Sequence, residues 1–394
     1  MRVEEEVPVF FRGMARMPAE GIVTTSMGYL RDEIRPGETL PGIAARGLPE
    51  ALARCDEVLL SFAGKLGDTI LAFGAVTAVL KYLELIRPER LPVVRVFGPH
   101  AALFDQLDVL DLFDVRKSAS VPKAARTVLI GDRQGVSMGA QADVGRVLSI
   151  FTCEPEDPPC WRSGTEAYPA LPARYFLTIE RRVGIRLPDE DGFMPVLHAA
   201  DADESADRQT LNVGVVTATS WPMRKDYAQP CFLDALRLLG NDRGQQIRAL
   251  IVPGMEGTST SELDTAPSGV KVELLRDAHY SLAAQSLAEC DLVIGNDTGL
   301  THLAAATRLP NGTGPQVIGL YARHSHAKWR TGLPWHHALA TAFSEKMYRE
   351  DRCPVRDKID DRAFGVAAEI GSIKPGQLAQ AASEALGTPA EVGQ

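Results

Sequence analysis

Short apolar runs that end in glycine or a polar turn, each followed by a helix-length segment, constrain the fold of this chain most strongly. The first run covers residues 58–62, and Gly64, Gly67 and an apolar segment reaching Leu83 follow it. Repetition of strand, loop and helix in this order is typical of a parallel sheet covered by helices. Further strands are expected at 93–97 and 127–130, and a second series at 211–217, 247–252, 270–274, 292–294 and 317–320.

The chain length and two composition changes predict the domain organisation. A chain of 394 residues exceeds what a single hydrophobic core usually organises, so two domains are expected. Residues 1–54 show no clear period and are interpreted as an N-terminal extension. Residues 153–207 are rich in Pro, Glu and Asp, and their end has the composition of a linker. The predicted domains are therefore 55–206 and 207–394, and the C-terminal tail is considered as a segment that crosses back to the first domain.

Charge and composition argue against several classes of protein. The net charge of −9 gives no electrostatic footprint for nucleic acid, so no nucleic-acid partner is expected. The apolar run at 69–80 is too short to cross a bilayer, and the N-terminus carries Glu4, Glu5 and Glu6 instead of a secretory signal. The six cysteines are scattered, as in proteins of a reducing compartment. A cytoplasmic protein without a membrane span is expected, while the oligomeric state cannot be inferred.

The sharpest motif lies at 290–306, where a buried strand ends in a polar turn that begins a helix of small residues. Asp297 or Thr298 would cap this helix, and the N–H groups of Thr298, Gly299 and Leu300 would face outward. Such a turn binds anions, because the free N–H groups and the helix dipole both favour negative charge. The alternative is that Asp297 and Thr298 are only a helix cap and that His302 is an ordinary helix residue.

A second motif lies at 59–70 and contains Lys65, Gly67 and Asp68. A P-loop would need Gly at position 59 and Ser or Thr at position 66, and both positions hold leucine. A carboxylate at position 68 could instead act as a general base. The alternative for Asp68 is a simple N-cap of the following helix.

Two further segments carry polar and cationic residues after a predicted strand. Hydroxyls and cations follow 211–217, and they suit a diphosphate. The negative charge of a diphosphate increases when it departs as a leaving group, and nearby cations stabilise it. The alternative is a solvated basic turn. After 317–320 come Arg323 and Ser325. Four histidines there could suggest zinc, but no ligand set with suitable spacing accompanies them, and no metal is expected. The residues of these segments are Thr217, Thr219, Arg224, Lys225, His324, His326, His336 and His337.

The motif at 290–306 resembles the D-[ST]-G-x-x-H-L-A signature of the ADP-heptose heptosyltransferases, glycosyltransferase family 9, through Asp297, Thr298, Gly299, His302 and the Leu303-Ala304 pair. The resemblance covers about 56–335. It implies an α/β GT-B fold, in which two Rossmann-like doubly wound domains face across a cleft, with the acceptor on the N-terminal domain and the donor on the C-terminal one. The sequence departs from the family pattern at Ala322, where the family has glycine, and in the basic residues that follow.

The resemblance also assigns roles to individual residues. Asp68 corresponds to the family's catalytic base, and the donor diphosphate would be held by Thr217, Thr219, Lys225, Asp297, Thr298, Gly299 and His302, with Arg224 as a substitute cation. Met255 and Glu256 are candidates for the nucleotide base or ribose. Lys65, Gly67, Arg323 and Ser325 are candidates for the sugar or the acceptor.

The expected activity is an inverting, metal-independent transfer of a hexose or heptose from an ADP- or UDP-linked sugar, without a further cofactor. The chain has no basic amphipathic stretch of the kind expected for a membrane-bound acceptor, so a small soluble acceptor such as a nucleoside or an aminoglycoside is favoured. The alternatives are a heptosyltransferase acting on the lipopolysaccharide core, a non-catalytic nucleotide-sugar-binding protein and a sugar-nucleotide epimerase.

Overall fold

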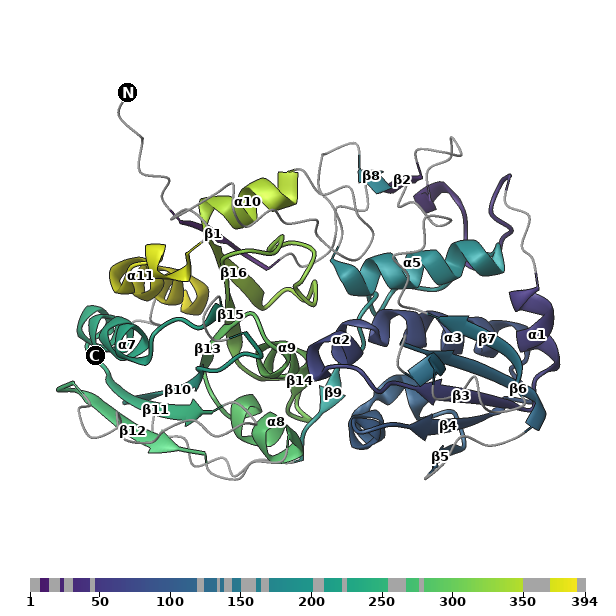
Figure 1. The fold of residues 1–394 in the computed structure, drawn as a ribbon, viewed down its shortest axis with the longest axis horizontal. Helices are drawn as coiled ribbons and strands as arrows, with labels where there is room; N and C mark the ends of the chain where they lie inside the picture. The colour runs from purple at the N-terminus through teal and green to yellow at the C-terminus, as the bar shows by residue number, and fades with distance from the viewer. Residues whose placement is uncertain are drawn as a thin grey trace. The chain divides into compact units, whose positions relative to one another are not determined.

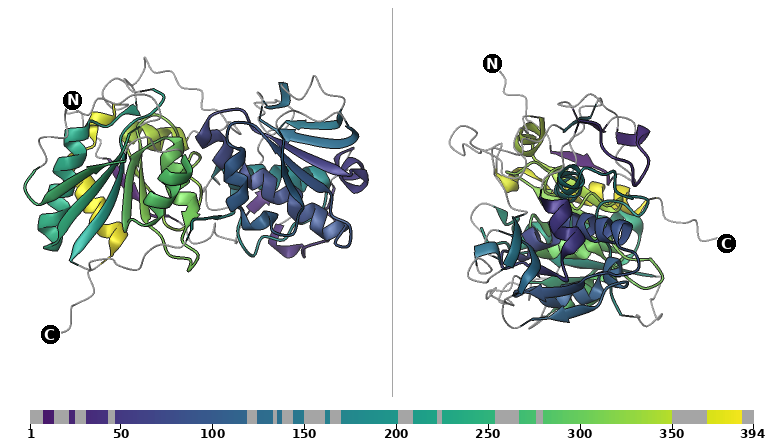
Figure 2. Two further views of the ribbon diagram at one scale, coloured as in Figure 1. Left: turned by 90° about the horizontal axis from the view of Figure 1, so that it is seen from below. Right: turned by 90° about the vertical axis from the view of Figure 1, so that its right-hand side faces the viewer.

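The computed structural model divides the chain into two α/β units. The C-terminal unit comprises Met1–Ala15, His198–Asp351 and Asp357–Gln394, and the N-terminal unit comprises Arg16–Leu197 and Arg352–Arg356. The structure describes residues 8–13, 22–24, 31–42, 47–118, 124–132, 135–137, 144–149, 161–163, 170–200, 209–221, 225–253, 267–275, 280–349 and 369–387. Each unit is described by itself (Figures 1 and 2).

The N-terminal unit contains a parallel five-stranded sheet in the order β5-β4-β3-β6-β7. The strands are β3 (Glu57–Ser61), β4 (Val93–Phe97), β5 (Val115–Lys117), β6 (Ala124–Gly131) and β7 (Val144–Ser149). Since β3 lies in the middle and the chain moves outward on both sides of it, this is the doubly wound arrangement predicted from the sequence. A separate antiparallel pair joins β2 (Ile22–Thr24) and β8 (Trp161–Ser163).

Helices α3 (Phe73–Ile86) and α5 (Leu171–Val183) pack against each other beside this sheet, and α1 (Leu48–Arg54) contacts both (Figure 1). The approach of α3 to α5 is close, because a Cβ on Gly74 would lie 2.0 Å from the carbonyl oxygen of Pro172. Short 3-10 helices at Arg31–Glu33, Ala101–Gln106 and Asp108–Leu110 complete the described part of this unit.

The helix expected after β3 is divided into α2 (Leu66–Leu71) and α3, with Ala72 between them. Together they form an apolar helical stretch of 21 residues, Leu66–Ile86, which is long enough to cross a membrane by length and composition. Within this stretch, 78% of the most apolar window is buried inside the protein. That burial is typical of the core helix of a globular α/β unit.

The C-terminal unit contains a seven-stranded sheet in the order β1-β16-β15-β13-β10-β11-β12. All neighbours pair in parallel except the edge strand β1, which runs antiparallel to β16. The strands are β1 (Val9–Phe11), β10 (Thr210–Val216), β11 (Gln246–Val252), β12 (Val270–Leu274), β13 (Leu292–Asn296), β15 (Gln316–Tyr321) and β16 (His336–Ala340). Without β1, this is again the Rossmann strand order.

Helices cover the two faces of this sheet. Alternate residues such as Val213 and Val215 belong to a core shared with α7 (Gln229–Arg243) and α11 (Pro375–Leu386), which lie side by side (Figure 1). On the opposite face, Gly214 lies so close to α8 (Tyr280–Ala288) that an added Cβ would be 2.6 Å from Leu287. Helix α9 (Gly299–Ala306) contacts α8, and α10 (Ala342–Arg349) contacts β16. A short 3-10 helix at Ile370–Ser372 precedes α11, and a two-stranded pair joins β9 (Leu197–His198) to β14 (Thr307–Arg308).

The division between the units differs from the predicted domains. It lies between Leu197 and His198 instead of between residues 206 and 207. The segment 1–54, which the sequence suggested as an extension, is shared by both units: β1 extends the C-terminal sheet, whereas Arg31 is buried in the N-terminal unit. Arg31 is held there by Glu180 at 2.6 Å and Asp189 at 2.8 Å. The tail was considered as a segment that crosses back: its described helix, residues 375–386, packs against residues 229–243 of the C-terminal unit, and 350–368 and 388–394 lie outside the described part of the chain.

Candidate functional site

The topology of the C-terminal sheet indicates one position at which a ligand would bind. Strands β10 and β13 are neighbours in the middle of the sheet, and the chain leaves them for helices on opposite faces, α7 and α9. In such sheets ligands bind at the carboxyl ends of the two strands, where the following loops diverge. The residues that leave these strand ends are those of the predicted Thr217 and Asp297 motifs.

Asn296 closes the space between the two strand ends. Its side chain is fully buried, its amide nitrogen donates to the carbonyl oxygen of Thr217 at 2.6 Å, and its amide oxygen accepts from the N–H of Tyr227 at 3.0 Å. Diverging loops leave such backbone groups without a partner in the sheet, and burying them unsatisfied is costly. Asn296 therefore fixes the loop after β10 relative to the turn after β13.

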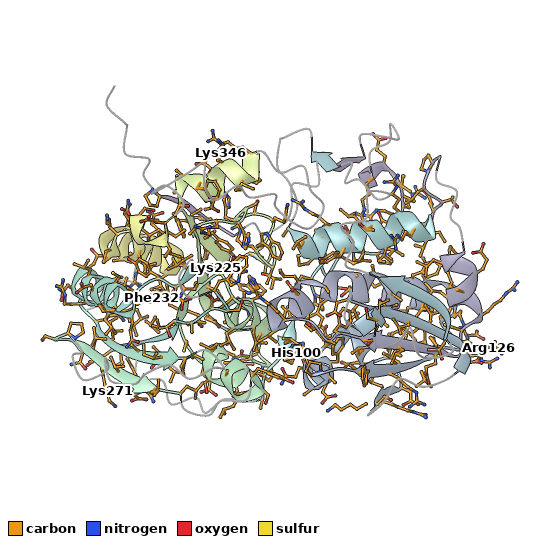
Figure 3. The ribbon with its side chains drawn as sticks, in the orientation of Figure 1. His100, Arg126, Lys225, Phe232, Lys271 and Lys346 are labelled. Atoms are coloured by element: carbon orange, nitrogen blue, oxygen red, sulfur yellow. The ribbon has the colours of Figure 1, made fainter. Side chains whose placement is uncertain are left out.

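Asp297 lies at the centre of a group of charged and titratable side chains. Its Oδ2 atom is 2.5 Å from Nζ of Lys225 and 3.0 Å from Nδ1 of His324, and its Oδ1 atom is 3.7 Å from Nε2 of His302. Burial raises the pKa of this carboxyl, but Lys225 and the two histidines outweigh it and hold the pKa well below its ordinary value. Asp297 is thus ionised and paired. Figure 3 labels Lys225 within this unit.

His302 is a buried neighbour of this carboxylate. Burial lowers the pKa of His302 to about 4, although the Asp297 charge acts in the opposite direction. The imidazole is therefore neutral near pH 7. Of these two neighbours, Lys225 is the cation that pairs with Asp297.

The first turn of α9 offers backbone donors beside this group. Its first intrahelical hydrogen bonds run from the N–H groups of Thr301 and His302 to the carbonyl oxygen of Thr298. The N–H groups of Gly299 and Leu300 have no acceptor within the helix. Thr298 is the N-cap residue, but its side chain makes no capping hydrogen bond. The side chain of Asp297 bonds to Lys225 and His324, so a cap alone does not describe Asp297.

Close packing holds this turn in place. Gly295 lies at the end of β13, where an added Cβ would be 2.3 Å from Oγ1 of Thr301. The same hydroxyl donates to the carbonyl oxygen of Asn296 at 2.6 Å. Since the helix lies directly on the strand, the Asp297 turn is rigidly placed.

Two hydroxyls of the loop after β10 differ in their contacts. Oγ1 of Thr217 is buried and has no hydrogen-bond partner among the described residues, whereas Oγ1 of Thr219 donates to Asp226 at 2.6 Å. Trp221 follows with its side chain half exposed, and its carbonyl oxygen accepts from the N–H of Lys225 at 3.0 Å. Lys225 is bonded to Asp297 and is 15% exposed, so this lysine is not a solvated surface cation.

The loop after β15 contributes His324, which the sequence analysis considered only for zinc. Of the candidates nearby, Arg323 is half-buried, and Ser325 is fully buried, with its Oγ accepting from the N–H of Lys328 at 3.4 Å. Arg224, Met255 and Glu256 lie outside the described residues.

The four histidines considered for zinc make four separate sets of contacts. His324 bonds to Asp297, and the ring of His326 stacks on Phe11 with centroids 3.9 Å apart. Nδ1 of His336 accepts from the N–H of Thr331 at 3.1 Å. Nδ1 of His337 accepts from the N–H of Gly13 at 2.8 Å, so its Nε2 carries the proton donated to Gln316. Among the residues that the structure describes, no three His, Cys, Asp or Glu side chains form a metal-binding group.

The two tryptophans of this region take part in packing. Trp335 lies under Arg308, whose guanidinium carbon is 3.7 Å from the ring centroid, and its indole N–H donates to the carbonyl oxygen of Ala305 at 2.7 Å. The ring of Trp329 lies 5.3 Å from that of His324. Trp329 thus borders the Asp297 group, and Trp335 supports the far end of α9.

The N-terminal unit places Lys65, Gly67 and Asp68 at the carboxyl end of β3, the corresponding position in its own sheet. Asp68 lies in the first turn of α2 and is half-buried, and the N-cap position of that helix is held by Lys65. The simple N-cap alternative for Asp68 is therefore wrong. Lys65 is exposed and Gly67 is half-buried.

Two residues that the sequence analysis missed hold the loop before Asp68. The buried Asp132, directly after β6, accepts from the N–H groups of Gly64 at 2.6 Å, Ala63 at 3.1 Å and Gly135 at 2.6 Å. Nε2 of His100 lies 3.1 Å from the carbonyl oxygen of Gly64 (Figure 3). The sequence signal was present, because Gly131-Asp132 ends an apolar run as Asn296-Asp297 does.

Comparison with known proteins agrees with this architecture. The family model described as glycosyltransferase family 9 (heptosyltransferase) matches residues 108–358. The structure of a glycosyl transferase family 9 protein from Veillonella parvula superposes with a TM-score of 0.55 at 12% identity, covering 84% of this chain and 97% of that one.

Two Escherichia coli structures are also similar. Heptosyltransferase WaaC with ADP gives a TM-score of 0.47 at 14% identity, covering 73% of this chain and 94% of that one. The iron-containing dodecameric glycosyltransferase TibC gives a TM-score of 0.46 at 13% identity, covering 83% of this chain and 78% of that one. No curated protein sequence matches the chain.

The predicted GT-B class is thereby confirmed, since each unit has the doubly wound α/β topology and the Veillonella structure shares the fold. The family model spans more than half of the chain and includes β13, the Asp297 turn and α9. The chain is a glycosyltransferase that belongs to glycosyltransferase family 9, the heptosyltransferases.

Proposed function

We propose that this glycosyltransferase moves a hexose or heptose from an ADP- or UDP-linked sugar to a hydroxyl of a small soluble acceptor, with inversion at the anomeric carbon. The proposal rests on one observation. Lys225, Asp297 and the first turn of α9 lie together at the carboxyl ends of β10 and β13. This is the position at which doubly wound sheets bind nucleotides.

The site supplies what a departing nucleoside diphosphate needs. When the bond between the anomeric carbon and the phosphate oxygen breaks, the electron pair stays on that oxygen and its negative charge increases. Lys225 and the N–H groups of Gly299 and Leu300 are positive groups fixed before the reaction, so they stabilise the charge as it develops. The buried hydroxyl of Thr217, which has no partner within the described part of the chain, is a further donor.

Asp68 is the proposed base that removes the proton of the acceptor hydroxyl. The support is its position in the first turn of α2, at the carboxyl end of the central strand of its own sheet. The hydrogen bonds of Asp132 and His100 to the preceding loop fix the backbone that leads to it. A base must be held within hydrogen-bond reach of the proton it removes, which a fixed loop favours.

We propose that the transfer needs no metal ion. Lys225 is bonded to the Asp297 carboxylate and supplies positive charge of the kind that a cation supplies in metal-dependent transferases. We also propose that the protein acts in the cytoplasm; Cys55, Cys231 and Cys290 are free thiols, as expected in a reducing compartment.

The test is the release of nucleoside diphosphate from ADP- and UDP-linked hexose and heptose, with three acceptor classes: an aminoglycoside, a nucleoside and a lipopolysaccharide inner core. Asp68→Asn should lower kcat by roughly a hundredfold or more, because it removes the base. Asp111→Asn, on an exposed carboxylate of the same unit, is the matched control and should leave kcat unchanged.

Transfer only to lipopolysaccharide core would replace the proposed acceptor with that alternative. Binding of the donor without transfer to any acceptor would contradict the proposed reaction. Full turnover by Asp68→Asn would show that Asp68 is not the base.

A further inference from the structure

The imidazole of His324 is fixed by an anion on one side. Its Nδ1 lies 3.0 Å from Oδ2 of Asp297, the oxygen to which Lys225 also donates at 2.5 Å. In an imidazole ring the two nitrogens point in different directions, so Nε2 is directed away from Asp297. Side-chain exposure at His324 is 18%, against 8% at Asp297. The ring therefore extends from the buried carboxylate toward the surface of the site.

The backbone and the other face of His324 are also held. Oγ of Ser344 donates to the carbonyl oxygen of His324 at 2.5 Å, and Oγ1 of Thr341 donates to that of Ala322 at 2.8 Å. The ring lies 5.3 Å from the Trp329 ring at 38°. A histidine oriented by a carboxylate and packed on an aromatic ring is placed for a function at its other nitrogen.

The neighbouring charges decide what that nitrogen can bind. Among the described residues, the Asp297 carboxylate joins His324 to one further charged group, Lys225, while the neutral His302 lies by the other Asp297 oxygen. With Nδ1–H donated to Asp297, a proton on Nε2 makes the ring a cation with a second N–H donor. An anion at Nε2 would then complete two charge-assisted hydrogen bonds on one ring.

We propose that His324 is a second cationic contact to the phosphate that leaves with the nucleotide, beside Lys225. This inference rests on the proposed function. As the bond from the anomeric carbon to the β-phosphate oxygen breaks, the electron pair remains on that oxygen, and Nε2–H of His324 donates a hydrogen bond to this phosphate. His324 keeps its protons, and the proton of the acceptor hydroxyl goes to Asp68. Asp297 acts as the positioning residue of both cations.

The test compares nucleoside diphosphates with their monophosphates. His324→Asn places an amide N–H near the position of Nδ1, so it can keep the bond to Asp297 while it removes the cation and Nε2. The probes are ADP, UDP, GDP and dTDP with AMP, UMP, GMP and dTMP, measured by titration calorimetry. His198→Asn, on an exposed histidine of the same unit, is the matched control.

We expect His324→Asn to weaken binding of the preferred diphosphate about tenfold, the size of one charge-assisted hydrogen bond, and that of its monophosphate less than about twofold. A residue that only shaped the site would weaken both nucleotides equally.

An unchanged ratio of diphosphate to monophosphate affinity in His324→Asn would overturn the role of His324 while leaving the proposed function intact. If the wild type bound none of the four diphosphates, the proposed function itself would fail, and this inference with it.

Discussion

The carboxylate of Asp132 accepts a hydrogen bond from the N–H of Gly64 at 2.6 Å and so joins the ends of β6 and β3. Asn296 makes the matching connection in the C-terminal unit, between the ends of β13 and β10. In both sheets these strands are the central pair from which the chain leaves in opposite directions. One polar side chain at this point satisfies backbone groups that the sheet cannot pair, and it orders the loop before a candidate site residue.

Asp132→Asn tests the connection in the N-terminal unit. The amide directs donors at backbone N–H groups, so we expect a loss of about 2 kcal/mol of folding free energy and a lower kcat. The donor Kd should not change, because Asn296 and Asp297 belong to the other unit. Urea unfolding, kcat and donor binding measure the three effects, with Asp111→Asn as the control. An equal loss of donor affinity and kcat would show that Asp132 does not act through the Asp68 loop.

Asn296→Ala tests the connection in the C-terminal unit. It leaves the N–H of Tyr227 and the carbonyl oxygen of Thr217 buried without partners, at roughly 1 to 3 kcal/mol each. We expect lower stability and weaker binding of the nucleotide donor. Asn241→Ala, at an exposed position of α7, should change neither quantity. If Asn296→Ala lowered the stability but bound the donor as tightly as the wild type, Asn296 would stabilise the fold without ordering the donor site. That result would contradict this account.

The pH dependence of stability follows from histidines buried in neutral form. Burial lowers the pKa of His302 and of His337 to about 4, and those of His326 and His336 well below 6.5. Between pH 6.5 and about 4 the unfolded chain binds more protons than the folded one, so stability falls as the pH falls. At pH 5 the two histidines with a pKa of about 4, His302 and His337, each cost about 2 kcal/mol relative to neutral pH. Asp297 does not act in this window, because its depressed pKa matters only at lower pH.

His337→Gln isolates one of these groups. Nδ1 of His337 accepts from Gly13 just after β1, and protonation would break that bond. A glutamine cannot take up this proton, so the slope of unfolding free energy against pH should be shallower in the variant. Urea unfolding at pH 7.5 and pH 5 measures the slope, with the exposed His198→Gln as control. Equal slopes in all three proteins would mean that His337 is not buried neutral.

Metal removal should leave the activity unchanged. Lys225 already neutralises Asp297, and His324, His326, His336 and His337 take part in separate contacts. Turnover is compared before and after dialysis against EDTA, and again after Mg²⁺ or Mn²⁺ is restored. A loss on dialysis that a metal ion reverses would refute the metal-independent mechanism.

The sequence predicted most of the parallel strands, because apolar runs such as those at 93–97 and 270–274 occur as strands with the same bounds. Strand β16 was missed since it begins with two histidines, which read as polar although both are buried. The pairing of β1 with β16 was not predictable either. It joins residues far apart in the chain, and its specificity comes from Phe11, Gly13 and the buried histidines they contact.

The candidate site was predictable where a motif carries it, as for Asp297 and Lys225, which the structure brings together at 2.5 Å. The partners that fix these motifs were not. Asn296 and Asp132 each follow an apolar run, which the sequence shows, but they act through backbone groups of distant loops, which it does not. His324 stands in a segment read for metal binding, and only the fold shows that its Nδ1 faces Asp297.

The central claim is that a nucleoside diphosphate binds at Lys225 and Asp297. Its most direct test is the thermal shift of the wild type, Lys225→Met and Lys271→Met with ADP, UDP, GDP and dTDP, each relative to its own ligand-free protein. A ligand at a hundred times its Kd adds about 2.7 kcal/mol of stability. The account predicts that one diphosphate raises the Tm of the wild type and of Lys271→Met, the variant of an exposed lysine in the same unit (Figure 3). The same nucleotide should give a much smaller shift with Lys225→Met. No shift with any nucleotide, or equal shifts in all three proteins, would contradict it.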